Sequence, residues 1–304
     1  MGSLRISSSP HLRSGTTTRK IMTDVLIALL PCVVASIVIF GARSLLVIAT
    51  CVATALICEY LSCRFMKRDN SIFDMSAAVT GVLLALTLPA NTPLYIVALG
   101  AAFSIVIVKQ LFGGIGNNIF NPALAGRAFM LISFAAQIGN CDPVIQDAIT
   151  GATPMAPGYS AGLNYWQLAL GAYPGAMGET CVVAIVLGLI YLLIRRVISY
   201  RIPVFMLGAT VLTSIAVGRD PFFEILAGGV VFGAVFMATD YVTSPMSKLG
   251  QIIYAVLCGV LTVIIRAFGA YPEGTMFAIL IMNAATPLID KLVRPRVFGE
   301  VKGQ

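Results

Sequence analysis

The sequence predicts an all-α polytopic membrane protein with about ten transmembrane helices in two inverted five-helix repeats. Of its 304 residues, 58% are hydrophobic and only 11% are charged, whereas soluble domains carry about 25% charged residues. The apolar residues gather in a succession of long stretches, as expected for helices that cross a bilayer. In addition, the same order of motifs occurs in both halves of the chain, which predicts the repeat.

The predicted helices follow one another from a polar, basic tail over residues 1–21. No small-residue cleavage site follows the first apolar span, so this span is expected to stay as a helix. A full span needs about 20 residues, and the stretches at 76–89, 203–218 and 222–239 are therefore expected to be short or broken. In order, the predicted spans are 22–41, 44–63, 76–89, 94–112, 119–137, 179–196, 203–218, 222–239, 250–269 and 274–290.

The basic residues predict the orientation of these spans. With the N-terminus in the cytoplasm and ten crossings, all but four of the 20 Lys and Arg residues lie on the cytoplasmic side; the four are Arg43, Arg219, Arg266 and the intramembrane Arg127. Loops rich in Lys and Arg remain in the cytoplasm, so both termini are predicted to be cytoplasmic. The long polar loop between the fifth and sixth spans then lies on the outer, non-cytoplasmic face.

Matching motifs divide the chain into two halves. An Ile-Phe-Asp motif at 72–74 opens a short span in the first half, and a Phe-Phe-Glu motif at 222–224 opens one in the second. Because five is an odd number, two successive five-helix units point in opposite directions, which is the inverted-repeat plan of many transporters. The resulting division is a first repeat over 22–137, an outer loop over 138–178, a second repeat over 179–290 and a cytoplasmic tail over 291–304.

The cysteines favour no metal or iron–sulfur site. No two of them form a Cys-x-x-Cys pair, and most fall within or beside apolar spans, where inert buried thiols are expected. Only the cysteine in the polar loop is a candidate for redox chemistry. The seven are Cys32, Cys51, Cys58, Cys63, Cys141, Cys181 and Cys258.

The polar loop also contains the segment Asp-Ala-Ile-Thr-Gly-Ala-Thr over residues 147–153. Thr153 follows Gly151 and Ala152, and a small, exposed threonine of this kind can enter another enzyme's active site as an acceptor. By composition alone the segment is a glycine-containing turn.

In this context the segment resembles the Asp-x-x-[Ser/Thr]-Gly-Ala-Thr site at which a flavin transferase joins FMN to Thr through a phosphoester bond. With the membrane plan around it, the chain resembles the RnfD/NqrB family of membrane electron-transfer subunits. Residues 120–128 (Phe-Asn-Pro-Ala-Leu-Ala-Gly-Arg-Ala) and the Met-Ala-Thr-Asp and Thr-Ser-Pro motifs within 237–245 also resemble this family. The resemblance extends from Ser14 to Lys291, and the short N-terminal tail favours the RnfD branch.

The resemblance implies that Thr153 carries a covalent FMN. Asp147, Thr150, Gly151 and Ala152 complete the motif, and the hydroxyl of Thr150 is not the expected acceptor, because the family has Ser or Thr there. No basic residue is near in sequence to neutralise the phosphate, so backbone N–H groups of the turn are expected to bind it. The resemblance also implies a second, non-covalent flavin such as riboflavin in the helical bundle.

Five further residues are predicted to contact a cofactor. Asn121 is expected to cap a helix that begins at a proline. Arg127 lies inside a span, where it is expected either to pair with a flavin oxygen or an acidic side chain, or to extend to the cytoplasmic edge. Asp240, Thr243 and Ser244 follow a short span and form either a flavin or ion contact or an ordinary helix end.

Two other groups of residues have alternative interpretations. Glu59 either faces an interior path or, as slightly favoured, the cytoplasmic interface. Four loop aromatics either stack on a flavin or belong to the membrane interface, where aromatic residues are common. These aromatics are Tyr159, Tyr165, Trp166 and Tyr173.

By resemblance, the function is that of an FMN-carrying membrane subunit of an ion-translocating ferredoxin:NAD oxidoreductase, with coupled Na⁺ or H⁺ transport and no catalysis by the subunit alone. The implied partners are RnfA, RnfB, RnfC, RnfE and RnfG, a flavin transferase and membrane lipid, with no nucleic acid, in a bacterial cytoplasmic membrane. The alternatives are an NqrB-like subunit of a Na⁺-translocating NADH:quinone reductase, a passive channel or secondary transporter, and a structural subunit without its cofactor.

Overall fold

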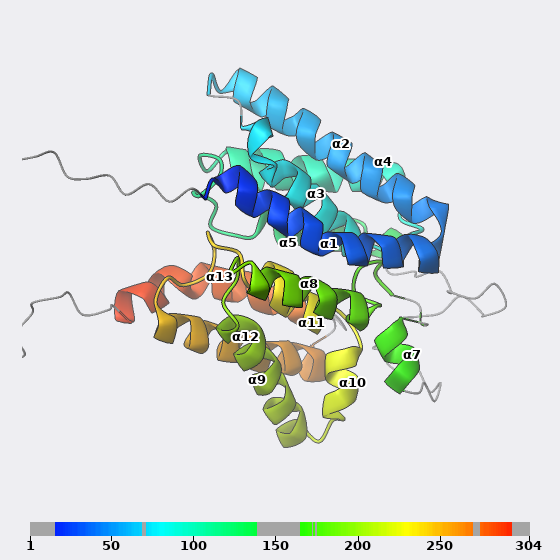
Figure 1. Ribbon diagram of the computed structural model, residues 1–304, viewed down its shortest axis with the longest axis vertical. Helices are drawn as coiled ribbons and strands as arrows, with labels where there is room; N and C mark the ends of the chain where they lie inside the picture. The colour runs from blue at the N-terminus through cyan, green and yellow to red at the C-terminus, as the bar shows by residue number, and fades with distance from the viewer. Residues whose placement is uncertain are drawn as a thin grey trace, which may run out of the picture.

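The computed structural model describes residues 16–68, 71–138, 165–171, 173, 175–269 and 274–293, and these are helical without any strand. The helices of the first half lie in one layer and those of the second half in another (Figure 1). This arrangement confirms the predicted all-α class. By length and composition α1, α2, α12 and α13 are each able to cross a membrane, and five further apolar helices are shorter.

The first half contains all five predicted spans. Its third span, α3, ends at Leu86, shorter than predicted, and its fifth is interrupted at Phe134 between α5 and α6. Its fourth span begins as an α-helix and continues as a π-helix. The elements are α1 (Thr18–Phe40), α2 (Ala42–Phe65), η1 (Ile72–Asp74), α3 (Ser76–Leu86), α4 (Leu94–Ala102), η2 (Phe103–Gln110), α5 (Pro122–Ser133) and α6 (Ala135–Ile138).

The second half contains the other five spans. The predicted span 222–239 is broken: α10 ends at Leu226, and Gly228 adopts a φ of +75°, which is accessible mainly to glycine, before the chain becomes helical again. The elements are α7 (Tyr165–Leu170), α8 (Val182–Ile194), α9 (Arg201–Val217), α10 (Pro221–Leu226), α11 (Val230–Phe232), η3 (Gly233–Met237, a π-helix), α12 (Lys248–Phe268) and α13 (Gly274–Leu292).

The same packing relations recur in the two halves. The second helix packs on the fourth in each half, as α2 on α4 and α9 on α12, and the fourth packs on the fifth. The first helices α1 and α8 pack on each other in opposite directions, because Asp24 near the start of α1 contacts Tyr191 and Arg195 at the end of α8. These are the relations expected of two inverted five-helix units.

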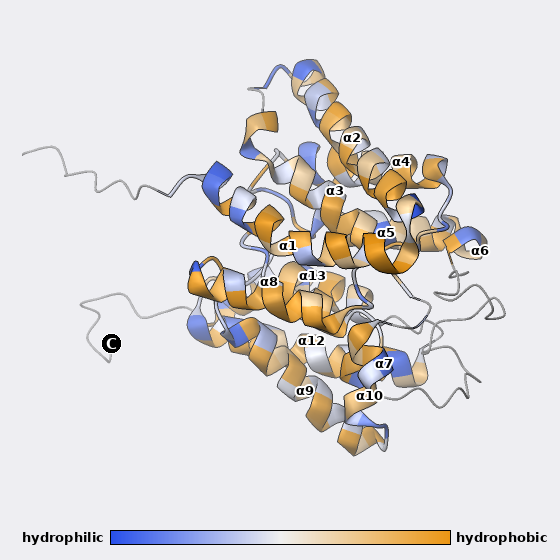
Figure 2. Cartoon of the chain, turned by 45° about the vertical axis from the view of Figure 1, so that its right-hand side comes forward, coloured by the Kyte–Doolittle hydropathy of each residue, from blue (hydrophilic) through white to orange (hydrophobic). Residues whose placement is uncertain are grey.

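The bundle has two distinct ends. The start of α1 and the end of α13 lie at one end, and α7 lies at the other (Figure 1). We name the first the α1 end and the second the α7 end. Hydrophobic residues predominate along α1, α2 and α8, and hydrophilic residues gather toward helix ends (Figure 2). Val34 of α1, Leu46 of α2 and Leu187 of α8 are among the exposed apolar residues. Such side chains are suited to contact with lipid tails.

Candidate functional site

Two cavities with polar groups in mainly apolar walls lie inside this bundle, one toward each end. The larger, which we call the Asp240 cavity, has a volume of about 90 Å³ and is lined near the α1 end by Met22 and Ile198. The smaller, which we call the Glu179 cavity, has a volume of about 20 Å³ and is lined near the α7 end by Thr87 and Glu179.

The Asp240 cavity combines apolar walls with a polar edge. Val79 and Leu83 of α3 and Phe236 of η3 form part of the walls, and Asn118 and Thr239 contribute to the edge. Apolar walls with a few convergent polar groups are typical of cofactor sites.

Asp240 lies at this edge because the chain turns sharply after η3. Its Oδ2 accepts a hydrogen bond of 3.2 Å from the Thr243 hydroxyl, and its Oδ1 accepts one of 3.5 Å from the Val242 N–H. Burial raises the pKa of Asp240, and the bonds from Val242 and Thr243 oppose that rise. Ser244 donates its backbone N–H to the Asp240 carbonyl. The three residues predicted as one contact thus form one turn, of which Asp240 reaches the cavity.

A buried ion pair lies beside this cavity, and its lysine, Lys109, is part of the wall. Lys109 Nζ lies 2.8 Å from Glu59 Oε1, and the side chains are 3% and 0% exposed. The ammonium also donates to Glu59 Oε2 and to the Ser76 hydroxyl, so its three N–H groups are all used. Glu59 therefore faces the protein interior and not the cytoplasmic interface, in contrast to the favoured expectation. The reason is that Lys109, 50 residues away in sequence, neutralises it.

The Glu179 cavity is bordered by a second buried ion pair. Arg127 Nη1 lies 2.8 Å from Glu179 Oε1, and the side chains are 5% and 9% exposed. Of the roles predicted for Arg127, the structure shows the pairing with an acidic side chain. Gly229 makes room for it, since a Cβ there would lie 2.5 Å from Glu179 Cδ.

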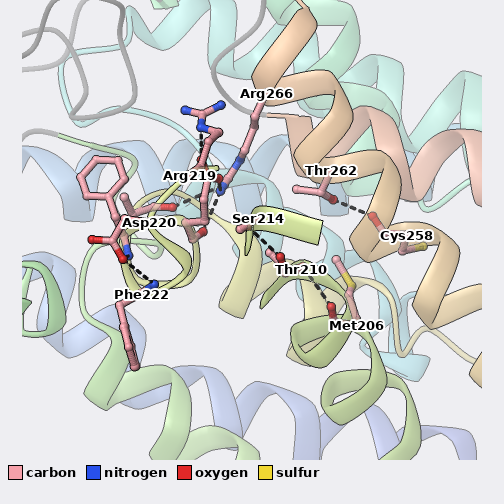
Figure 3. Close-up of polar contacts among 12 residues, drawn as sticks. Met206, Thr210, Ser214, Arg219, Asp220, Phe222, Cys258, Thr262 and Arg266 are labelled. Atoms are coloured by element: carbon pink, nitrogen blue, oxygen red, sulfur yellow. Dashed lines mark hydrogen bonds and ion pairs between the residues drawn. The ribbon is translucent and has the colours of Figure 1, made fainter. Parts of the chain in front are cut away.

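A third charged cluster lies at the α7 end. Glu224 is fully buried and contacts Arg266 Nη1 and Arg219 Nε, each at 2.8 Å. Arg219 and Arg266 reach it from the α9–α10 turn and from α12 (Figure 3). Together with the two ion pairs above, this cluster holds the helices in one arrangement. Moving a helix away would leave a buried charge without its partner, which is energetically costly.

Two of the sequence-predicted residues belong to α5, Asn121 at its N-cap and Arg127 within it. Asn121 caps the helix as predicted, since its Oδ1 accepts from the N–H groups of Ala123 (3.0 Å) and Leu124 (3.5 Å). Its Nδ2 donates to the Met237 carbonyl at 3.2 Å. Asn121 lines the Asp240 cavity, whereas Arg127, further along the same helix, lines the Glu179 cavity. The predicted contacts therefore belong to two sites.

The described loop aromatics differ in how far they are buried and in what they contact. Tyr173 is buried, and its hydroxyl donates to the Glu179 and Leu226 carbonyls, each at 3.4 Å, so its ring is not exposed for stacking. Tyr165 donates to Asp220 Oδ2 at 2.6 Å, and that bond raises the pKa of Tyr165. The side chain of Trp166 is 80% exposed.

The FMN-attachment motif lies outside the described residues, as do Tyr159 and Cys141. The motif residues concerned are Asp147, Thr150, Gly151, Ala152 and Thr153. In the part of the chain that the structure covers, the six cysteines are free, and no group of three or more His, Cys, Asp or Glu side chains could hold a metal ion.

Sequence reasoning did not single out Lys109, Glu179 or Glu224 as site residues. A signal for all three was present: they fall within the predicted spans 94–112, 179–196 and 222–239, where an ionisable residue is by default a functional candidate. Their partners lie 42 to 52 residues away, and the sequence offers no rule for matching them.

The chain matches known proteins over almost its whole length. A model of the NQR2, RnfD, RnfE family matches residues 5–299. The chain is 42% identical over 307 residues to the D subunit of the Na(+)-translocating ferredoxin:NAD(+) oxidoreductase complex of Acetobacterium woodii, covering 98% of this chain and 96% of the relative. It is also 42% identical over 316 residues to the D subunit of the Proton-translocating ferredoxin:NAD(+) oxidoreductase complex of Clostridium ljungdahlii, covering 97% and 96%. With the D subunit of the Ion-translocating oxidoreductase complex of Salmonella paratyphi A it shares 35% identity over 349 residues, covering 98% and 99%.

Proposed function

The chain belongs to the NQR2, RnfD, RnfE family, and we propose that it is the RnfD-type membrane subunit of an ion-translocating ferredoxin:NAD⁺ oxidoreductase and that it carries FMN on Thr153. The observation that supports this most is the match to such subunits over nearly the full length of both chains. The two relatives at 42% identity are named for different ions, Na⁺ and H⁺, so identity does not assign the ion.

The proposed FMN attachment rests on the motif at residues 147–153. The segment between α6 and α7 contains it, and α7 lies at the end of the bundle opposite the start of α1. With the N-terminus in the cytoplasm, as the distribution of basic residues favours, Thr153 is then on the outer side. In this orientation the protein is a multi-pass protein of the bacterial cytoplasmic membrane.

A second, non-covalent flavin such as riboflavin is proposed for the Asp240 cavity. The lining has the chemistry that suits this group: Val79, Leu83 and Phe236 offer apolar contact to a ring system, and Asp240 offers carboxylate oxygens as acceptors at its polar edge. The cavity of about 90 Å³ would have to widen to admit a whole flavin, since ligand pockets have volumes of about 300–1,000 Å³. When bound, such a flavin supplies electron transfer in steps of one or two electrons. The protein supplies position, polarity and exclusion of water.

The Lys109 ammonium has no free N–H group with which to bind the phosphate of a phosphorylated flavin in this cavity. Its three N–H groups are used by Glu59 and Ser76, so a phosphate would have to displace one of these partners. A neutral side chain such as that of riboflavin meets no such requirement.

The proposed assembly includes the partners expected from the family, namely RnfA, RnfB, RnfC, RnfE and RnfG, with a flavin transferase for maturation. An FMN on the outer side is separated by the bilayer from a cytoplasmic electron donor, so other redox groups must carry electrons across. The membrane subunit then serves as a relay that does not react with the soluble donor directly.

In-gel flavin fluorescence tests the covalent FMN. The full chain is co-expressed with a competent flavin transferase, denatured and separated on a gel. Wild type and the Thr150→Ser control are expected to fluoresce, whereas Thr153→Ala is expected to be dark. A dark wild-type band refutes the attachment and favours the channel or structural alternatives, which flux measurements in liposomes then separate.

Acid extraction tests the second flavin separately. In the Thr153→Ala background the protein is purified, extracted and assayed for released flavin by chromatography. The expected result is released riboflavin, which is lost when Val79→Trp fills the apolar wall of the Asp240 cavity. An extract without flavin, or one that Val79→Trp leaves unchanged, overturns this assignment.

A further inference from the structure

The two cavities are built from corresponding elements of the two halves. The Asp240 cavity takes residues from the first part of α3, from the segment after η3 and from the start of α5. The Glu179 cavity takes Gly229 and Gly233 from the corresponding third span of the second half, Thr87 from the segment after α3, and Thr275 from the start of α13. Each cavity is thus the inverted counterpart of the other, at opposite ends of the bundle.

One hydrogen bond lies between the two cavities. Asn121 lines the Asp240 cavity and Met237 lines the Glu179 cavity, and the Asn121 Nδ2 donates to the Met237 carbonyl at 3.2 Å. The side-chain amide of Asn283 lies 3.1 Å from the Asn121 backbone nitrogen and contacts the Tyr254 hydroxyl at 2.8 Å. These groups form a narrow polar layer inside an otherwise apolar region.

The Glu179 cavity contains a buried hydroxyl without a partner. Thr275 lines the cavity and is 6% exposed, and its Oγ1 has no hydrogen-bond partner among the described residues. Several other threonine hydroxyls in the spans bond to their own helix, as Thr210 does to the Met206 carbonyl and Thr262 to the Cys258 carbonyl (Figure 3). Leaving a buried hydroxyl unpaired is energetically unfavourable, so a partner is expected.

The size and walls of this cavity are suited to water. About 10–15 Å³ is enough for one water, which needs two to four polar partners, and the cavity has about 20 Å³. Thr275 is one partner, and the Glu179 carboxylate and the Thr87 hydroxyl oxygen are further acceptors in the wall. The Arg127 guanidinium in the same wall disfavours a metal cation, because like charges at contact distance repel. Gly233 keeps the space open, since a Cβ there would lie 2.8 Å from Thr275 Cγ2.

We propose that the Glu179 cavity is a hydrated site whose water bonds to the Thr275 hydroxyl and the Glu179 carboxylate. The Asn121–Met237 hydrogen bond separates this site from the Asp240 cavity, and we call this polar barrier the septum. The two cavities are then the halves of one polar path through the bundle, interrupted at a single polar contact. This inference rests on geometry alone and does not require a flavin in either cavity.

X-ray hydroxyl-radical footprinting of the purified full chain tests the hydrated site. Radiolysis of a bound water oxidises the side chains next to it, and Met237 and Met276 both line the Glu179 cavity. Met130 and Met206 are fully buried away from either cavity and serve as matched controls. In wild type, Met237 and Met276 are expected to oxidise faster than both controls.

Replacing the Thr275 hydroxyl, which is proposed to bind the water, tests the same site with a variant. Thr275→Val keeps the shape of the side chain, and oxidation of Met276 is expected to fall to the rate of Met206. Equal rates for all four methionines in wild type, or an unchanged rate for Met276 in Thr275→Val, overturn the hydrated site. The wild-type comparison needs no variant, so it remains decisive even if Thr275→Val fails to fold.

A leak measurement tests the septum. Asn121→Ser keeps an oxygen that can cap α5 but removes the donor to Met237. In proteoliposomes holding a pH gradient, this variant is expected to let the gradient decay faster than wild type does. Asn117→Ser, at an exposed residue of the preceding loop that lines neither cavity, is expected to match wild type. An Asn121→Ser variant that holds the gradient as long as wild type, or an Asn117→Ser variant that loses it as fast as Asn121→Ser, overturns the septum.

Discussion

Replacing Lys109 with methionine tests the buried charge that borders the Asp240 cavity. Methionine is close to lysine in length but carries no charge, so Lys109→Met leaves the buried Glu59 carboxyl without its counter-charge. The expected result is a large loss of stability, because removing one partner of a buried ion pair leaves an uncompensated charge.

The magnitude follows from the contact geometry. At the observed 2.8 Å between Nζ and Oε1, two unit charges attract by about 6 kcal/mol at an effective dielectric constant of about 20. Desolvation of both groups offsets part of this attraction, and truncating one partner of such a pair costs about 3–5 kcal/mol. The double variant Lys109→Met/Glu59→Gln retains no buried charge and is expected to recover most of that loss.

Reversible unfolding in mixed SDS micelles measures these free energies. The reaction of buried thiols such as Cys51 and Cys258 with a fluorogenic maleimide reports unfolding, since both are fully buried in the folded chain. Arg195→Met is the control, because Arg195 is 43% exposed in its pair with Asp24 and such pairs contribute about 0–1 kcal/mol. A loss below about 1 kcal/mol for Lys109→Met, or a double variant whose loss is the sum of the two single losses, would refute the reasoning.

Two further predictions concern the α7 end and use the same unfolding assay. Glu224→Gln removes the charge that two arginines share and leaves buried Arg266 without a counter-charge, so a loss of about 3–5 kcal/mol is expected; a loss within about 1 kcal/mol would contradict it. Gly229→Ala places a Cβ 2.5 Å from Glu179 Cδ and is expected to cost about 1–3 kcal/mol by overpacking. Gly208→Ala has no atom within 4 Å of its new Cβ, so it is expected to leave stability unchanged or raise it, as exposed helix interiors prefer alanine; equal effects at both glycines would contradict the packing argument.

Much of the fold was predictable because membrane insertion depends on local composition. Apolar length alone indicates a span, and each of the ten predicted spans corresponds to a helix or a broken helix in the structure. The cap of α5 by Asn121 was predictable for the same reason, since it involves only residues two and three positions away. The span 222–239 was correctly expected to be short or broken, but the position of the break was not predicted, because a glycine pair inside an apolar run does not say where a helix ends.

The sequence by itself determined the class of the protein, its spans, its doubled plan and the motif at 147–153 that resembles a flavin attachment site. Only the tertiary structure decided that Glu59 pairs with Lys109, that Arg127 pairs with Glu179, and that these pairs border two inverted cavities. The physical reason is that lipid tails are as apolar as leucine, so hydrophobicity does not specify which helices pack together. Those contacts depend on close packing and on a few polar side chains far apart in sequence, and their pairing exists only in the assembled bundle.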